Sequence, residues 1–235
     1  MTQWLPAEDW QALWLTLWVA LWTVVLGGPL ALGVAFALAR RRRILGHGLL
    51  NLAVHLPLVL PPVVTGYALL VAFGQRGPIG GVLEQSLGLV LSFRWTGAVL
   101  AAVVMAFPLM VRPMRQAIEA VNPRIEEMAA SLGASPWVVW RTVTLPLILP
   151  GIVIGAVMGF AKALGEFGAT ITFVAAIPGQ TRTIASAVNA YLAVPGQEAA
   201  VLRLVVLSLA LSILALALAE GLGRWAARRI AGQGD

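Results

Sequence analysis

The stretch LILPGIVIGAVMGFAKALGEFGATITFV, residues 147–174, contains only two charged side chains, Lys162 and Glu166. An apolar run longer than about 18 residues is typical of a membrane-crossing helix, because helices buried in a soluble core are usually shorter. Four comparable stretches cover residues 10–39, 48–74, 95–111 and 199–221. The sequence therefore predicts an all-α, polytopic transmembrane bundle of about five spans, with six as the upper count.

The composition agrees with a membrane environment. Hydrophobic residues make up 60% of the chain and charged residues 11%, against roughly 25% charged residues in an average soluble domain. The chain has no cysteine, which excludes disulfides, thiolate metal sites and a cysteine nucleophile. Most of the basic residues lie at the ends of apolar stretches, so the net charge of +6 indicates orientation in a bilayer rather than binding of nucleic acid.

Basic residues fall on alternate connections between the apolar stretches, which must share one side of the membrane. They are at positions 40–43, at 112, 115, 124 and 141, and at 224, 228 and 229. Because Arg and Lys in short loops favour the cytoplasmic side, we expect the N-terminus outside and the C-terminus inside. Arg76, Arg94 and Arg182 are exceptions on external loops. The predicted organisation is an extracytoplasmic N-terminus (1–9), a membrane domain (10–221) and a cytoplasmic tail (222–235).

Two segments depart from a simple span. Residues 82–93 are too short to cross a membrane and contain Glu84, which indicates an interfacial or re-entrant segment. In the second stretch, Pro57, Pro61 and Pro62 each remove a backbone donor, so the helix must bend. This bend is either a gate hinge beside a transport pathway or a static kink, and the sequence leaves both open.

The connection 113–146 reads as a helical hairpin. Asn122 can cap a helix with Pro123 at its first position. An apolar stripe with helical spacing follows, formed by Ile125, Met128, Ala129 and Leu132. Gly133 suits the left-handed position that ends such a helix, and Ser135 with Pro136 starts another.

This hairpin resembles the conserved cytoplasmic loop of ABC importer permeases, written E-A-A-x3-G-x9-I-x-L-P. Glu127, Ala129, Gly133, Leu145 and Pro146 match at the family's spacing, while Met128 and Val143 replace Ala and Ile. The resemblance implies a type I ABC importer permease fold in which this loop docks on an ATPase subunit. It implies coupling roles for Glu127, Met128, Ala129, Gly133, Ala134, Leu145 and Pro146. The alternative is an ordinary amphipathic helix on the membrane surface.

The chain has no nucleotide site of the P-loop type, since its only lysine, Lys162, lies between two alanines. We therefore expect no enzyme activity and no cofactor in this chain, and ATP and Mg²⁺ on a separate ATP-binding subunit. His47 and His55 are the only histidines and have no nearby carboxylates, which gives no support to metal catalysis or to a catalytic triad.

Two further strings resemble molybdate permeases. They are HLPLVLPPVVTGY, residues 55–67, and GEFGATITFV, residues 165–174, the latter followed by IPG (177–179) and TRTI (181–184). The GEFGA core is similar to that of sulfate and thiosulfate permeases, so it indicates a tetrahedral oxyanion more strongly than molybdenum. The resemblance implies molybdate transport, with tungstate and sulfate or thiosulfate as alternatives.

Candidate pathway residues lie in and after these strings. Lys162 and Glu166 are four residues apart, and they form either a structural or gating ion pair or a site that meets the passing dianion. The threonine hydroxyls and Arg182 are candidates to receive an oxyanion, while for Thr170 and Thr172 a bond back to a helix carbonyl is the favoured alternative. The candidate pathway or gate set is Pro61, Pro62, Thr65, Tyr67, Lys162, Glu166, Thr170, Thr172 and Arg182.

The partners implied are an ATP-binding subunit, an extracytoplasmic molybdate-binding protein, the lipid bilayer and a second copy of the chain in a homodimer. The expected location is the bacterial cytoplasmic (inner) membrane. A rival from another class is an anion channel that conducts without ATP. A membrane enzyme or scaffold is the other rival, for which the sequence shows no catalytic constellation.

Overall fold

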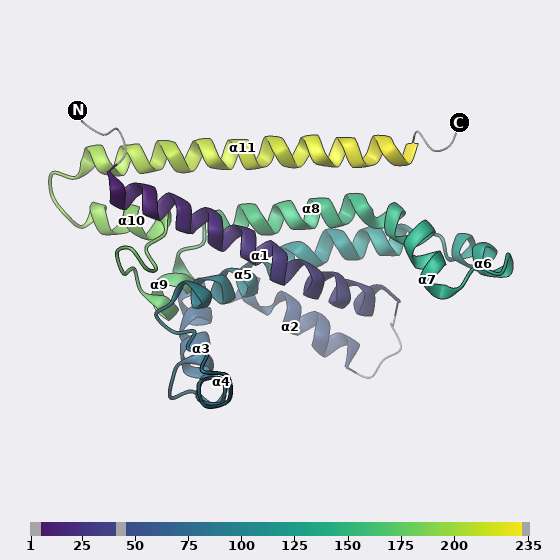
Figure 1. The fold of residues 1–235 in the computed structure, drawn as a ribbon, viewed down its shortest axis with the longest axis horizontal. Coiled ribbons are helices and arrows are strands. Elements are labelled where there is room, and N and C mark those ends of the chain that lie inside the picture. Colours follow the sequence, from purple (N-terminus) through teal and green to yellow (C-terminus); the bar gives the residue numbers. More distant parts are fainter. Residues whose placement is uncertain (1–5, 41–45, 232–235) are drawn as a thin grey trace.

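The computed structural model describes residues 6–40 and 46–231, without the side chains of residue 219 and of residues 222–231. The described part is helical throughout, with no strand (Figure 1). Its elements are α1 (Ala7–Arg40), α2 (His47–Val59), α3 (Pro62–Phe73), α4 (Gly80–Leu87), α5 (Trp95–Ala120), α6 (Pro123–Ser131), α7 (Pro136–Val139), a π-helical turn (Trp140–Thr144), α8 (Leu145–Leu164), α9 (Gly168–Val174), α10 (Ile184–Leu192) and α11 (Glu198–Ala231).

The described helices include four that are long and apolar enough to cross a membrane: α1, α5, the α7–α8 unit and α11. A fifth crossing is reached if α2 and α3, which are bent by 118° at a short break, count as one broken span. The predicted all-α bundle of about five spans is confirmed. Parts of the predicted termini and Arg41–Arg43 of the basic run lie outside the described residues.

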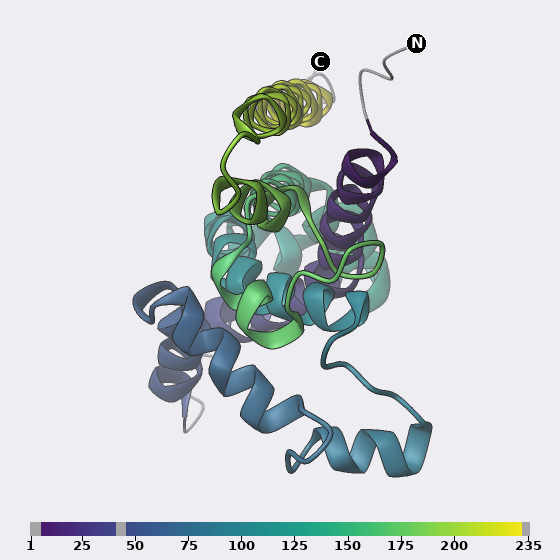
Figure 2. The same ribbon diagram turned by 90° about the vertical axis from the view of Figure 1, so that its left-hand side faces the viewer.

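Helices α1, α5 and α8 pack together as the centre of the bundle, with α11 along one side and α2 along the other (Figures 1 and 2). The α6–α7 hairpin projects at one end of the molecule. Helices α9 and α10 lie at the opposite end, with α10 beside the start of α1 and α9 against α3 and α5. The two ends of the bundle therefore carry different elements.

A stripe of small residues brings α8 against α5. Gly151, Gly155 and Gly159 are buried at four-residue spacing on one face of α8. A Cβ added at Gly151 would lie 2.8 Å from the Pro113 carbonyl oxygen, and one added at Gly155 would lie 2.8 Å from that of Met110. Such close backbone approach is the usual way in which helices associate where lipid supplies no hydrophobic drive.

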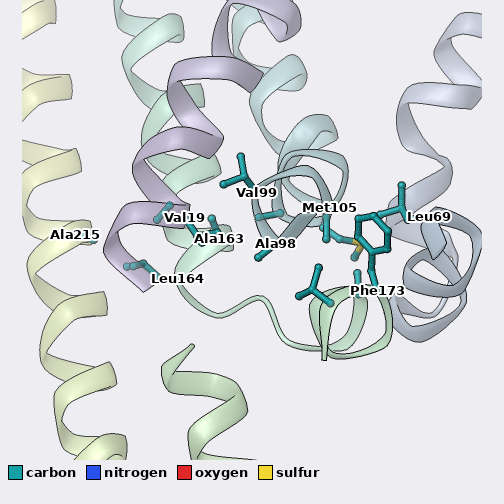
Figure 3. Close-up of a cluster of buried hydrophobic side chains, with 14 residues drawn as sticks. Val19, Leu69, Ala98, Val99, Met105, Ala163, Leu164, Phe173 and Ala215 are labelled. Carbon is teal, nitrogen blue, oxygen red and sulfur yellow. The ribbon is translucent and has the colours of Figure 1, made fainter. Parts of the chain in front are cut away.

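The largest buried cluster joins residues of six helices, α1, α3, α5, α8, α9 and α11. Phe173 of α9 is fully buried and packs beside Met105 of α5 and Leu69 of α3 (Figure 3). Val19 of α1 and Ala163 of α8 belong to the same cluster. A second cluster, around Met110, Met114 and Ile118, continues the core toward the α6–α7 end.

The limits of several predicted elements are wrong. The stretch 147–174 is not one span, because α8 ends at Leu164 and a separate short helix, α9, begins at Gly168. Residues 113–120 are not loop, since α5 continues through Pro113 to Ala120. The last predicted span, 199–221, by contrast agrees with the candidate span Glu198–Leu218, which lies within a helix that continues to Ala231. Apolar composition therefore located the spans but not all of their ends.

The short segment after the second span forms α4, which lies beside α3. Its last residue, Leu87, is exposed, and Gly88 ends the helix in the left-handed conformation with a φ of 66°. At eight residues it is too short to cross a bilayer, as the sequence predicts.

Candidate functional site

The hairpin of α6 and α7 is built from local signals that the sequence displays. The Asn122 side chain accepts a hydrogen bond from the Arg124 backbone N–H at 3.1 Å and caps α6. Gly133 has a φ of 87°, the left-handed conformation expected of it. The Ser135 hydroxyl accepts from the Val138 N–H at 3.4 Å and starts α7. The predicted cap and turn positions are confirmed.

One face of α6 is apolar and has no partner within the described chain. None of its residues is buried, and Met128 is 67% exposed, while Leu132 just beyond it is 90% exposed. Glu127 is exposed beside them, and Ala129 is partly covered. Exposed apolar groups on a projecting element are typical of a surface that docks another protein.

The hairpin is anchored to the spans by Glu126. The Glu126 carboxylate forms a 3.0 Å ion pair with Arg40 at the end of α1 and accepts a 2.6 Å hydrogen bond from the Thr144 hydroxyl. Sequence reasoning singled out its neighbour Glu127 and missed Glu126. No local signal could have found it, because Arg40 lies 86 residues away in the chain.

The hairpin also continues directly into the bundle. Helix α7, the π-helical turn and α8 follow one another without a gap. The Leu145 N–H bonds to the Trp140 carbonyl five residues earlier, just before Pro146, which has no N–H to donate. Trp137 and Trp140 stack at a centroid distance of 5.0 Å. The second helix of the hairpin is thus continuous with α8.

The two strings that resemble molybdate permeases meet in space. Helix α3, which begins in the first string, packs on α9, which belongs to the second. A Cβ at Gly66 would lie 2.5 Å from the Ala169 carbonyl oxygen, and one at Gly168 would lie 2.6 Å from Cβ of Pro62. Only glycine permits this approach at either position. The contact joins the proline break, Leu60 and Pro61, to the short helix after the α8 end.

Lys162 and Glu166 form an ion pair with an Nζ to Oε2 distance of 2.5 Å. Glu166 is buried and lies beyond the end of α8, and its Oε1 accepts a hydrogen bond from the Ala169 N–H at 3.0 Å. The carboxylate therefore satisfies a free N–H at the start of α9 while it binds the lysine at the end of α8. The pair fixes the break between the two helices.

The remaining candidate pathway residues occupy different surroundings. Thr65 is buried, and its Oγ1 has no hydrogen-bond partner among the described residues, whereas Tyr67 is exposed on the outer face of α3. Thr172 bonds back to the Gly168 carbonyl at 2.9 Å, as expected. Thr170 is buried in α9. Pathway roles for these residues stay predictions.

Arg182 lies apart from the other candidate pathway residues. It lies against α1, where its guanidinium reaches the Glu8 carboxylate at 3.4 Å. A cavity of about 370 Å³ at this point is lined by Glu8, Trp10, Trp14, Pro178 and Arg182, among others. Its role in receiving an oxyanion stays a prediction.

A buried polar cluster at the same end was missed by the sequence analysis. The Asp9 carboxylate of α1 binds the Arg203 guanidinium of α11 at 2.5 Å and accepts from the Tyr191 hydroxyl of α10 at 3.1 Å. Burial raises the pKa of the Tyr191 phenol, and its hydrogen bond to Asp9 raises it further. The sequence does contain one signal for this cluster. Arg203 is a charged residue inside an apolar stretch, and such a residue needs a partner.

Comparison with known proteins places the chain in a family. Residues 27–228 match the family described as "Binding-protein-dependent transport system inner membrane component". The chain belongs to this family. It is 49% identical over 220 residues to the "Molybdenum transport system permease protein ModB" of Escherichia coli (strain K12), covering 94% of this chain and 96% of the relative. It is 49% identical over 207 residues to the Haemophilus influenzae protein of the same name, covering 88% and 90%.

Solved structures of this kind of transporter share the fold. A bacterial ABC transporter involved in the import of alginate matches with a TM-score of 0.70 at 16% identity, covering 95% of this chain and 80% of that one. The MetNI methionine ABC transporter, in an inward-facing conformation, matches with a TM-score of 0.65 at 17% identity, covering 93% and 94%. The predicted type I ABC importer permease fold is thereby confirmed.

Groups of three or more His, Cys, Asp or Glu that could hold a metal ion are absent from the described residues. The structural features that fit a transport protein of this family are the projecting α6–α7 hairpin and the contact between α3 and α9. These two regions form the candidate functional site of this inner membrane component.

Proposed function

We propose that this chain is the membrane-spanning permease subunit of an ATP-driven importer that carries molybdate into the bacterial cytoplasm. The observation that carries the proposal is the exposed α6–α7 hairpin, whose apolar face has no partner in the described chain and whose second helix runs directly into α8. The 49% identity over 94% of the chain to a molybdenum transport permease supports the substrate.

The power source is a separate ATP-binding subunit that docks on the hairpin and holds ATP and Mg²⁺. Met128, Ala129 and Leu132 supply an apolar surface to that subunit, with Glu127 exposed beside them. Gly133 and Ala134 shape the turn, and Leu145 and Pro146 start α8. The chain itself binds no nucleotide in this mechanism, since its only lysine is used in the pair with Glu166.

Movement of the hairpin reaches the substrate pathway through α8. The far end of α8 carries Lys162, whose partner Glu166 caps α9, and α9 packs on α3 next to the proline break. A shift of α8 therefore changes the geometry at both strings, residues 55–67 and 165–174, at once. We assign the gate to this junction, with the Lys162 and Glu166 pair as a structural hinge rather than a deep anion trap.

The chain works as a homodimer with the pathway between two copies. Support comes from the outer face of α3, where Val63, Tyr67 and Val71 are exposed at four-residue spacing. Asp9, Arg182 and α10 lie at the extracytoplasmic end, where a molybdate-binding protein delivers the anion, and the hairpin lies in the cytoplasm. The N-terminus is outside and the C-terminus inside.

The test is uptake of radiolabelled molybdate by proteoliposomes that contain the chain, its ATP-binding subunit and the binding protein. We expect uptake that requires all three proteins and ATP, that a large excess of sulfate does not suppress, and that tungstate does suppress. Uptake by the chain alone would show an anion channel and refute the importer. ATP-driven uptake of sulfate in preference to molybdate would refute the substrate assignment alone.

A further inference from the structure

A polar cavity lies between α2 and α5 at the hairpin end of the bundle. It measures about 380 Å³ and is lined by Asn51 and His55 of α2 and by Arg112, Arg115, Gln116 and Glu119 of α5. None of these residues belongs to the coupling hairpin or to the gate junction described above. Since α5 ends at Ala120, immediately before the cap of α6, the cavity lies close to the cytoplasmic surface in the proposed orientation.

Part of the cavity lining is held in a fixed geometry. Arg115 donates from Nη1 to the Asn51 side-chain oxygen at 3.0 Å and from Nε to the Glu119 carboxylate at 3.0 Å. Because arginine has five N–H donors, these two bonds leave Nη2 available to a ligand. The His55 ring is also oriented, since its Nδ1 lies 2.8 Å from the Asn51 carbonyl oxygen.

Arg112 has a different environment from Arg115. It is exposed and makes no ion pair or hydrogen bond within the described part of the chain. It directly follows the predicted span 95–111, at the cytoplasmic end of the membrane part of α5. An arginine at a membrane boundary extends its guanidinium toward water, where an anion can reach it.

Helix α2 connects this cavity to the proposed gate. His55 lies six residues before Pro61, where the chain bends into α3 and meets α9. Along α2, His55 and Asn51 of the cavity therefore follow that junction toward the start of the helix. The lining contains two guanidinium groups and one carboxylate, so it carries a net positive charge. The Glu119 carboxylate weakens the attraction of this lining for an anion. Weak binding suits a site that an ion must leave.

We propose that this cavity binds a tetrahedral oxyanion and is the last site that the transported anion occupies before it enters the cytoplasm. The planar guanidinium groups of Arg112 and Arg115 match the paired oxygens of such an anion. The identity of the anion and the direction of travel rest on the proposed function. The phosphate of an anionic membrane lipid has the same chemistry, so the experiment must separate the two sources.

Binding is measured on the purified complex of this chain with its ATP-binding subunit, without the binding protein and without nucleotide. Equilibrium dialysis with radiolabelled molybdate compares the wild type with Arg112→Gln, and with Arg76→Gln as a control that removes the same charge at the opposite end. We expect saturable binding by the wild type and by Arg76→Gln, and at least tenfold weaker binding by Arg112→Gln. Equal binding by all three would overturn the proposal.

A second variant and a second readout complete the test. Asn51→Ala leaves every charge in place but removes the group that orients Arg115, so we expect it to weaken molybdate binding as well. Mass spectrometry then measures phosphatidylglycerol retained by the complex. Loss of this lipid in Arg112→Gln, with no molybdate bound by the wild type, would assign the cavity to lipid and overturn its role in exit.

Uptake and binding measurements separate the exit site from the importer. ATP-driven molybdate uptake by the wild-type system, together with unchanged molybdate binding in Arg112→Gln, refutes the exit site and leaves the importer intact. Absence of uptake by the complete wild-type system refutes the importer itself.

Discussion

At the scale of single residues, Gly133 forms the turn between α6 and α7. Its φ of 87° is strained for a β-branched side chain, although no heavy atom lies within 4 Å of an added Cβ. We expect Gly133→Val to disturb the turn by about 1–3 kcal/mol of strain and to weaken binding of the ATP-binding subunit at least tenfold. Calorimetric titration of the purified chain with that subunit measures the change.

Gly196 provides the matched control for this substitution. Its φ is 86°, also with open space around an added Cβ, and it lies before α11 at the other end of the bundle. Gly196→Val should therefore introduce the same strain without affecting the ATP-binding subunit. Gly133→Asn should largely retain binding, because asparagine tolerates the left-handed region. Equal losses in both valine variants would show that the turn has no specific coupling role.

Tyr191 gives a residue-scale prediction with a defined pH dependence. Burial and the hydrogen bond to Asp9 raise the pKa of its phenol above the ordinary value of about 10. The protonated phenol is the form that the folded chain favours, so its stabilisation is complete below about pH 10 and is lost as the pH rises through the raised pKa. Tyr191→Phe lacks both the bond and the titration.

We expect the wild type to be more stable than Tyr191→Phe by about 1 kcal/mol at pH 8, the usual net value of a partly exposed hydrogen bond. Thermal unfolding in detergent between pH 7 and 11 should show this advantage shrinking above about pH 10. If the stability difference between the wild type and Tyr191→Phe stays constant over this pH range, the phenol does not titrate in this cluster.

At the scale of elements, the stripe of buried glycines on α8 determines how closely α8 approaches α5. A Cβ at Gly151 would lie 2.3 Å from Cβ of Ala117 and 2.8 Å from the Pro113 carbonyl oxygen, and neither atom can rotate away. We expect Gly151→Ala to destabilise the chain by about 1–3 kcal/mol through overpacking. Unfolding by denaturant in mixed micelles measures the free energy.

The control for this substitution is Gly33→Ala in α1. Outside its own helix segment, no heavy atom lies within 4 Å of a Cβ at Gly33, so this change should be neutral or stabilising by up to about 1 kcal/mol through helix propensity. If the two alanine variants have the same stability, the packing of α8 on α5 does not depend on the stripe.

The same elements show how far sequence reasoning reaches. Asn122, Gly133 and Ser135 act on backbone groups only a few residues away, so the caps and the turn of the hairpin were predictable. The end of α8 was not, because the run from Leu147 to Val174 is apolar on both sides of the break. Lys162 and Glu166 were expected as an ion pair, but the bond from Ala169 that makes Glu166 a cap requires the fold.

The other contacts that sequence reasoning missed join segments that are far apart in the chain. The pair of Arg40 with Glu126 and that of Asp9 with Arg203 each join residues that no local pattern relates. The packing of α3 on α9 likewise depends on Gly66 meeting Ala169, although both strings were recognised separately. Periodicity and capping signals describe single elements, whereas the site forms where several elements pack against one another.

At the scale of the whole molecule, the two ends of the bundle are chemically distinct. One end presents the hairpin with its exposed Met128 and Leu132, together with the cavity that contains Arg112 and Arg115. The other end holds the Asp9 cluster, α10 and the loop around Gln180. In an importer the first end must meet an ATP-binding subunit in the cytoplasm, and the second must face the binding protein.

This polarity leads to a prediction that the chain is well suited to test, because it contains no cysteine. Ala130→Cys places a thiol on the exposed hairpin, and Gln180→Cys places one on an exposed loop at the opposite end. In intact spheroplasts we expect a membrane-impermeant maleimide to label Gln180→Cys but not Ala130→Cys. After permeabilisation both variants should be labelled, which controls for accessibility of the thiols. Labelling of Ala130→Cys from outside would reverse the proposed orientation, and the hairpin would then be unable to meet an ATP-binding subunit in the cytoplasm.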